Sequence, residues 1–95
     1  MVIKAKKKEK ALKHSKHVAW RKVAGEAVIL DVDTAVYYSM GGVGLRIWEL
    51  IGRKTPASKI VRVLSDEYEA PRSRIEGDLE RLVRKLKREK LVEAA

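Results

Sequence analysis

A change in the period of the apolar residues near position 41 constrains the fold of this chain most strongly. Before it lie three short runs rich in β-branched and aromatic residues, at positions 18–23, 27–32 and 35–40. Gly25-Glu26 and Asp33-Thr34 separate these runs, which is typical of turns between strands. After it, apolar residues recur every three to four positions, as in amphipathic helices. This order predicts an α+β fold, with a three-stranded antiparallel sheet followed by three helices.

Start and stop residues delimit the three predicted helices. The glycines from Gly41 to Gly44 mark the corner between the last strand and the first helix, and Gly52 closes that helix. Thr55-Pro56 indicates the start of the second helix, with Thr as the N-cap and Pro in the first turn. Pro71 opens the third helix, whose acidic residues come early and whose basic residues come late, as the helix dipole favours.

The net charge of +9 is concentrated at the N-terminus. Residues 1–22 hold nine Lys or Arg and one Glu, a net of +8, so residues 23–95 carry only +1. So polar a segment buries too little apolar surface to fold. We therefore expect a basic, flexible tail over residues 1–16 and one folded domain over residues 17–95. The chain has no apolar stretch long enough to span a membrane and no secretory signal, so we expect a cytoplasmic protein.

No pattern of residues indicates a catalytic, metal or cofactor site. His14 and His17 have the spacing of one helical turn, but no third ligand is near and the surrounding positive charge repels a cation. Asp31 and Asp33 fit a hairpin turn better than a catalytic carboxylate pair. Gly41-Gly42-x-Gly44 lacks the spacing of a nucleotide-binding loop. We therefore expect a binding protein that uses no metal or other cofactor, and not an enzyme.

The third predicted strand is the most informative feature for function. It carries no charge and no proline, whereas the first strand has Arg21 and Lys22, which protect a sheet edge. An unprotected edge aggregates, pairs with itself in a homodimer, or receives a strand from a partner. On the third helix, a mostly basic stripe from Arg74 to Arg88 runs beside the apolar one and would form a second wall. The candidate peptide-binding residues are Ala35, Val36, Tyr37, Tyr38, Ser39, Arg74, Ile75, Asp78, Leu79, Arg81, Leu82 and Lys85.

Several segments, in order and spacing, resemble the PqqD-like family. They are Val28–Asp31, Tyr37–Met40, Gly44–Ile51, Thr55–Ile60, the Asp78–Leu86 pattern and Leu91–Glu93. The resemblance covers about residues 18–93 and implies a winged helix-turn-helix-like fold. It further implies that the chain captures the leader of a ribosomally synthesised, post-translationally modified peptide as an added strand on the third strand, against the third helix. The partners implied are that precursor peptide and a radical SAM enzyme, another tailoring enzyme or a leader protease.

Several departures from the family pattern leave the specific pathway open, among them Lys90 at a position where a glycine is common. Gly41 stands where members usually carry Asn, and Thr34 and Ala35 stand where a glycine is common. The chain also lacks the Pro-Glu segment of the proteins of pyrroloquinoline quinone synthesis, so we do not assign it to that pathway. The alternative function is a winged-helix DNA-binding regulator, favoured by the basic tail. The chain has no Asn or Gln to read adenine, however, and its hairpin precedes the helices instead of following them.

Overall fold

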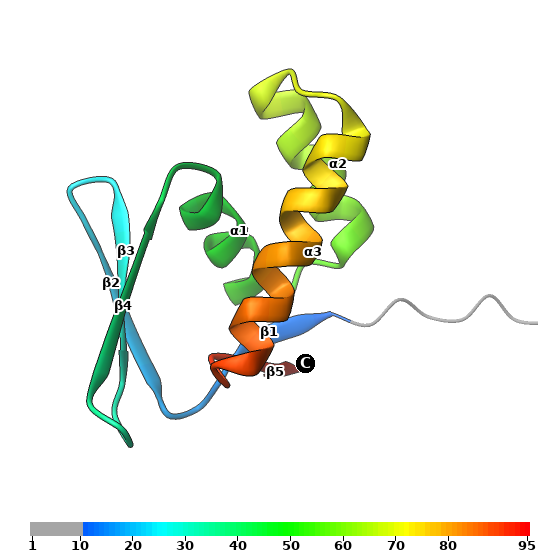
Figure 1. Cartoon of the computed structure of the whole chain (residues 1–95). Coiled ribbons are helices and arrows are strands. Elements are labelled where there is room, and N and C mark those ends of the chain that lie inside the picture. The colour runs from blue at the N-terminus through cyan, green and yellow to red at the C-terminus, as the bar shows by residue number, and fades with distance from the viewer. Residues whose placement is uncertain (1–10) are drawn as a thin grey trace, which may run out of the picture.

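The computed structural model describes residues 11–95 and confirms the predicted α+β order (Figure 1). A three-stranded sheet is followed by three helices, and two short strands flank this set. The elements are β1 (Leu12–His14), β2 (Val18–Val23), β3 (Glu26–Asp31), β4 (Val36–Gly41), α1 (Gly42–Gly52), α2 (Ala57–Tyr68), α3 (Arg72–Arg88) and β5 (Val92–Ala94). The predicted bounds of β2 agree with the structure, and those of β3 and β4 differ from it by one residue at each end.

Strands β2, β3 and β4 form an antiparallel meander with β3 in the centre. The first hairpin turns through Ala24 and Gly25, whose φ angles of 51° and 79° are those of a type I′ turn. In the second hairpin the Asp31 carboxylate accepts hydrogen bonds from the backbone N–H groups of Asp33 at 3.0 Å and Thr34 at 3.1 Å. This confirms the predicted turn role of Asp31. Burial opposes ionisation of this carboxyl, but these bonds outweigh it and lower the pKa of Asp31.

The segment before β2 differs from the predicted flexible tail. Leu12–His14 form β1, which pairs antiparallel with β5 at the other end of the described chain. Ser15 is buried, and its backbone N–H donates to the Leu91 carbonyl at 3.0 Å while its hydroxyl donates to the Lys90 carbonyl at 2.9 Å. The domain therefore begins before residue 17, because this segment is fixed by a partner some 80 residues away in sequence. The rest of the predicted tail, residues 1–10, lies outside the described residues.

All three helices lie on one side of the three-stranded sheet (Figure 1). Helix α1 packs directly on β3 and β4 and contacts α2, which in turn packs against α3. Trp48 of α1 and Ile29 of β3 are fully buried at the centre of the core, together with Leu64 of α2 and Leu86 of α3. This arrangement leaves one edge of the sheet beside α3, and no helix of residues 11–95 covers the other face of the sheet.

Candidate functional site

The outer edge of β4 is open in the described part of the chain. Within residues 11–95, β4 pairs with β3 alone, while β1 and β5 pair with each other in a separate sheet. The predicted strand around Val36–Ser39 is therefore an unpaired edge, as its sequence indicated. It contains neither a charged side chain nor a proline, the two features that usually protect such an edge.

The strand register determines which β4 backbone groups face outward. In an antiparallel pair, residues alternate between positions that bond the neighbouring strand and positions whose N–H and C=O point away from it. Val32 donates to the His17 carbonyl at 2.9 Å, and the two-residue turn closes on Val23 and Glu26, so even-numbered β3 residues bond β2. Odd-numbered β3 residues, such as Ile29 opposite Tyr38, therefore bond β4.

It follows that the backbone groups of Tyr37 and Ser39 point to the open edge. The β3 residues opposite them are Leu30 and Val28, whose own N–H and C=O groups point toward β2. Each of the two β4 residues thus offers one donor and one acceptor, which is the pattern that an incoming strand requires. Tyr38 and Met40 instead bond inward and hold the sheet together.

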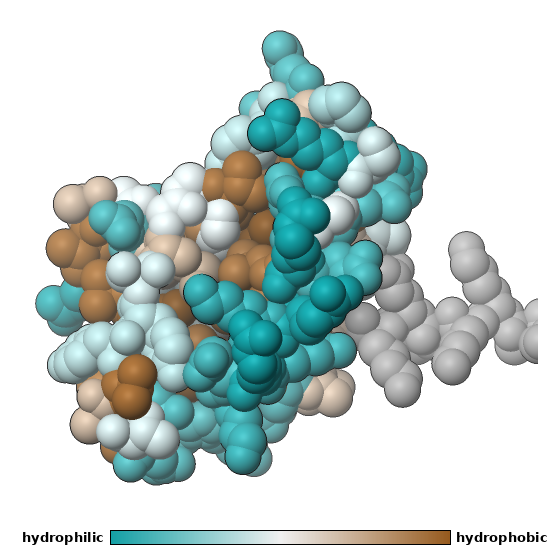
Figure 2. All heavy atoms as spheres, in the orientation of Figure 1, coloured by the Kyte–Doolittle hydropathy of each residue, from teal (hydrophilic) through white to brown (hydrophobic). Residues whose placement is uncertain are grey.

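A groove runs between β4 and the C-terminal half of α3, and we call it the β4–α3 groove. It consists of two hollows, and Tyr38 and Glu89 line both of them. The apolar hollow has a volume of about 250 Å³ and is lined by Tyr38, Ser39, Met40, Leu82, Lys85, Leu86, Glu89 and Leu91. The polar hollow has a volume of about 460 Å³ and is lined by His17, Asp31, Asp33, Thr34, Val36, Tyr38, Arg88, Glu89 and Lys90. In Figure 2, apolar surface shows between the sheet and the hydrophilic row of α3.

A side-chain hydrogen bond crosses the groove where the two hollows meet. The Tyr38 hydroxyl donates to Glu89 Oε2 at 3.1 Å, which joins β4 to the residue that follows α3. Desolvation, together with the Glu89 carboxylate, raises the pKa of the Tyr38 phenol, so this hydroxyl remains a donor at neutral pH. The bond links β4 to the end of α3 at the boundary between the two hollows.

The α3 wall of the groove is basic. Lys85 and Arg88 line the apolar and the polar hollow respectively. Arg88 Nε already lies 4.0 Å from Glu89 Oε1. Other basic residues of α3 are paired on the same helix: Arg81 contacts Asp78, and Arg84 contacts Glu80 at 2.8 Å. These internal pairs compete with binding to a phosphate backbone, so α3 does not favour the DNA-binding alternative.

The structure brings together only part of the predicted site. Val36, Tyr38 and Ser39 form the strand wall, and Leu82 and Lys85 lie opposite on α3. Tyr37 offers its backbone to the open edge, but its side chain lines neither hollow. Ala35 instead lies in the turn with a φ of 61°, and its N–H already donates to the Asp31 carbonyl at 2.8 Å. Five further α3 residues line neither hollow. They are Arg74, Ile75, Asp78, Leu79 and Arg81.

Burial explains why two of these residues lie apart from the groove. Ile75 and Leu79 are buried in the core, where they pack among α2 and α3 and offer no surface to a guest. Met40, Leu86 and Glu89 line the groove but are not among the residues predicted from the sequence, whereas Arg88 ends the basic stripe that was predicted as the second wall. Two signals in the sequence could have found some of them: Met40 is two residues from Tyr38 along the strand, and Leu86 is four residues from Leu82 along the helix.

The two histidines occupy separate environments. His14 stacks on Trp48 with ring centroids 3.7 Å apart, and its Nε2 lies 2.8 Å from the Trp48 carbonyl oxygen. Burial lowers the pKa of His14, although the hydrogen bond to Trp48 acts in the opposite direction. His17 Nε2 lies 3.6 Å from Asp31 Oδ2, at the end of the polar hollow. In the described residues no group of three His, Asp or Glu side chains is arranged to hold a metal ion.

Comparisons with known proteins match one family and two solved structures. Residues 26–92 match the family described as coenzyme PQQ synthesis protein D (PqqD). A structure of TbiB1 in complex with the TbiA(beta) leader peptide is 32% identical, with a TM-score of 0.81, and the match covers 85% of this chain and 94% of that one. Lasso peptide synthetase B1, complexed with its leader peptide, is 19% identical with a TM-score of 0.81 over 87% and 98% of the two chains. No curated protein sequence matches the chain.

None of the helices in residues 11–95 combines the length and the apolar character needed to cross a membrane.

Proposed function

The chain belongs to the PqqD family, and from this premise we propose that it is a non-catalytic module that captures the leader of a precursor peptide. The leader adds as a strand to β4, in the β4–α3 groove, and is held there for a tailoring enzyme or a leader protease. The TbiB1 structure supports this proposal, because that protein is 32% identical to this chain over the matched region and is in complex with a leader peptide. We place the event in the cytoplasm, where a ribosomally made precursor first meets its processing enzymes.

The outward backbone groups of Tyr37 and Ser39 are the observation on which the proposal depends. Two residues that each offer a donor and an acceptor hold four main-chain hydrogen bonds of an added strand. Main-chain bonds contribute affinity without regard to the guest sequence, so selectivity has to come from side chains. The groove provides these on its α3 wall.

The two hollows suggest what the guest carries. Alternate side chains of an added strand point toward the helices, as Tyr38 and Met40 do on β4. An apolar guest side chain fills the hollow formed by Met40, Leu82 and Leu86. A guest carboxylate pairs with Lys85 or Arg88 on the basic wall, which favours a leader with acidic residues next to its apolar anchor.

The test is binding of synthetic leader peptides, taken from the short reading frames beside the gene of this chain. We expect a dissociation constant in the submicromolar to micromolar range, or about −8 to −10 kcal/mol, by isothermal titration calorimetry. The matched control is a scrambled peptide of the same composition, which retains the charge but loses the spacing of anchor and acid. Equal binding of the two peptides would leave only electrostatic attraction and would refute capture by strand addition.

Light scattering separates the proposal from an edge-to-edge homodimer. A homodimer that pairs two β4 strands would hide the same backbone groups, so the peptide would have to dissociate it. We expect a monomer at low and high protein concentration. A dimer that is joined through β4 and persists when the chain is saturated with peptide would contradict the proposed binding mode.

A further inference from the structure

The face of the sheet that points away from the helices forms a second surface. Side chains alternate between the two faces along a strand, and Ala27 and Ile29 of β3 are fully buried on the helix side. Val28 and Leu30 therefore point to the other side, which we call the outer face. The register extends it to both neighbouring strands. The outer face consists of Ala19, Arg21, Val23, Glu26, Val28, Leu30, Tyr37 and Ser39.

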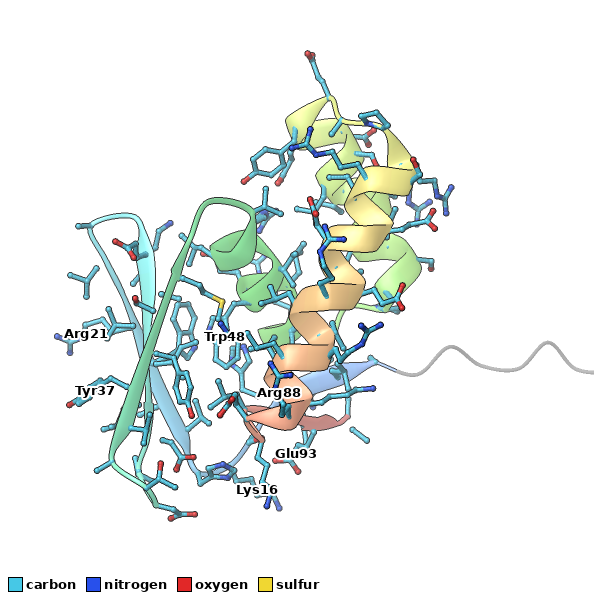
Figure 3. The ribbon with its side chains drawn as sticks, viewed as in Figure 1. Lys16, Arg21, Tyr37, Trp48, Arg88 and Glu93 are labelled. Atoms are coloured by element: carbon cyan, nitrogen blue, oxygen red, sulfur yellow. The ribbon has the colours of Figure 1, made fainter. Side chains whose placement is uncertain are left out.

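The outer face is largely apolar, and no element of the described chain covers it. Tyr37 is 68% exposed and Val23 is 48% exposed, and the half-buried Val28 and Leu30 lie between them. Figure 3 shows Tyr37 and Arg21 pointing away from the helices. Within residues 11–95 Arg21 has no ion-pair partner, whereas the neighbouring Lys22 lies 3.9 Å from Glu49 on the helix side. The outer face thus combines apolar side chains with the unpaired cation Arg21 and, beside the first hairpin turn, the carboxylate of Glu26, and a surface of this kind is suited to a protein partner.

The size of the outer face argues against a homodimer that buries this face alone. Three strands of six residues, about 4.8 Å apart and rising about 3.3 Å per residue, cover roughly 300 Å². A stable specific interface needs about 800 Å² from each partner. The outer face alone is therefore too small, and its partner must also contact something beside it.

The edge of β4 provides that addition. A strand added beside β4 continues the pleat, so every second guest side chain emerges on the outer face next to Tyr37 and Ser39. A protein on this face thus touches both the module and the exposed half of the captured peptide. An enzyme that acts on this peptide is the partner with a reason to touch both.

We propose that the outer face is the docking surface for the enzyme that processes the bound peptide, and that this enzyme presents an apolar surface with a carboxylate placed against Arg21. The inference rests on the proposed capture of a leader by β4. It also implies coupling, because the peptide forms part of the enzyme's contact surface. The peptide then strengthens enzyme binding, and the enzyme strengthens peptide binding by the same factor.

The experiment measures binding of the purified tailoring enzyme or protease encoded beside the gene of this chain, with and without the leader peptide. The variants are Arg21→Ala and Arg21→Glu, and Arg62→Glu on the exposed surface of α2 is the control with the same change of charge. Arg21 lies on β2, and both β3 and β4 separate it from the guest strand, so neither variant should change peptide affinity. We expect Arg21→Glu to weaken enzyme binding about tenfold or more, Arg21→Ala to weaken it less, and Arg62→Glu to leave it unchanged.

Each outcome separates the two proposals. Enzyme binding that is equal in wild type and Arg21→Glu overturns the docking surface but leaves peptide capture intact. A wild-type chain that binds the peptide but none of the encoded enzymes overturns it as well. If none of the leader peptides binds the wild-type chain, the proposed peptide capture is refuted, and the docking proposal that rests on it is refuted as well. A dimer of the wild type that Arg21→Glu dissociates would assign the outer face to a second copy, against our inference.

Discussion

Replacement of Ser39 by proline removes one outward N–H from β4 and leaves the rest of the sheet unchanged. The Ser39 N–H points away from β3, so no hydrogen bond of the sheet is lost. Proline is tolerated on edge strands where the N–H faces solvent, and we expect a loss of folding stability of only about 1 kcal/mol. The effect on an added strand is larger, because that strand loses a donor at its interface.

The expected loss of peptide affinity follows from the bond that disappears. A main-chain hydrogen bond contributes about 1 kcal/mol net, and an acceptor left buried without a donor costs a further 1–3 kcal/mol or so. The sum of about 2–4 kcal/mol corresponds to a roughly 30- to 1,000-fold higher dissociation constant. Calorimetry with the leader peptide measures this change, and circular dichroism checks that the variant is folded.

Two controls make the result specific to this edge. Ser39→Ala keeps the N–H and should bind the peptide as the wild type does. Lys22→Pro places the same defect on the opposite edge of the sheet, where the Lys22 N–H also points outward, and should leave binding unchanged. A folded Ser39→Pro variant that binds within about threefold of the wild type would refute strand addition to β4.

Three further predictions concern the groove and the fold. Lys85→Glu should weaken binding of an acidic leader about tenfold, whereas Arg62→Glu should not. If calorimetry gave the same dissociation constant for both variants, the charge contact would lie elsewhere. Burial lowers the pKa of His14, so folding favours its neutral form. The melting temperature should therefore start to fall as the pH drops below about 6.5, where the unfolded chain takes up a proton at His14. It should level off once the pH is below the pKa of His14 in the folded chain. A His14→Asn variant with the same pH profile would disprove this assignment. A chain that starts at Lys16 should unfold with about 3 kcal/mol less stability than one that starts at Ala11, because it lacks β1; equal denaturant midpoints would contradict the structural role of β1.

The sequence was sufficient to predict the elements whose signal is local. Runs of β-branched residues with turn residues between them located β2, β3 and β4 to within a residue. Thr55-Pro56 and Pro71 located the starts of α2 and α3 to within a residue, but the N-cap of α2 is Pro56 and not the predicted Thr55, and no side chain caps this helix. The unprotected third strand also followed from composition alone, since an edge without charge or proline is recognisable in any single strand.

Features that depend on distant partners could not be predicted in the same way. The β1 strand has only three residues among lysines, and it is stabilised by β5, by the stack of His14 on Trp48 and by the burial of Ser15. On α3 the apolar residues 75, 79, 82 and 86 look equivalent in sequence, yet Leu82 alone of them is half-exposed, and it faces the groove. The rotation of a helix by one residue is decided by packing, which the sequence does not display.

The direction of the β4 backbone groups is the third such feature. Which of Tyr37 and Tyr38 offers its N–H to a guest depends on the bonding pattern of β2 with β3, two strands into the sheet. The side-chain period of a strand carries no information on this point. The structure therefore adds the assignment of the open positions, Tyr37 and Ser39, to an edge that the sequence had already identified.

Amide hydrogen exchange of β4, measured by NMR with and without the leader peptide, tests the central claim most directly. In the free chain the amide of Tyr38 should exchange slowly and those of Tyr37 and Ser39 rapidly, and saturating peptide should slow these two about tenfold or more. Amides of Tyr37 and Ser39 that are already protected in the free chain, or that remain unprotected with the peptide bound, would contradict capture of a guest strand at this edge.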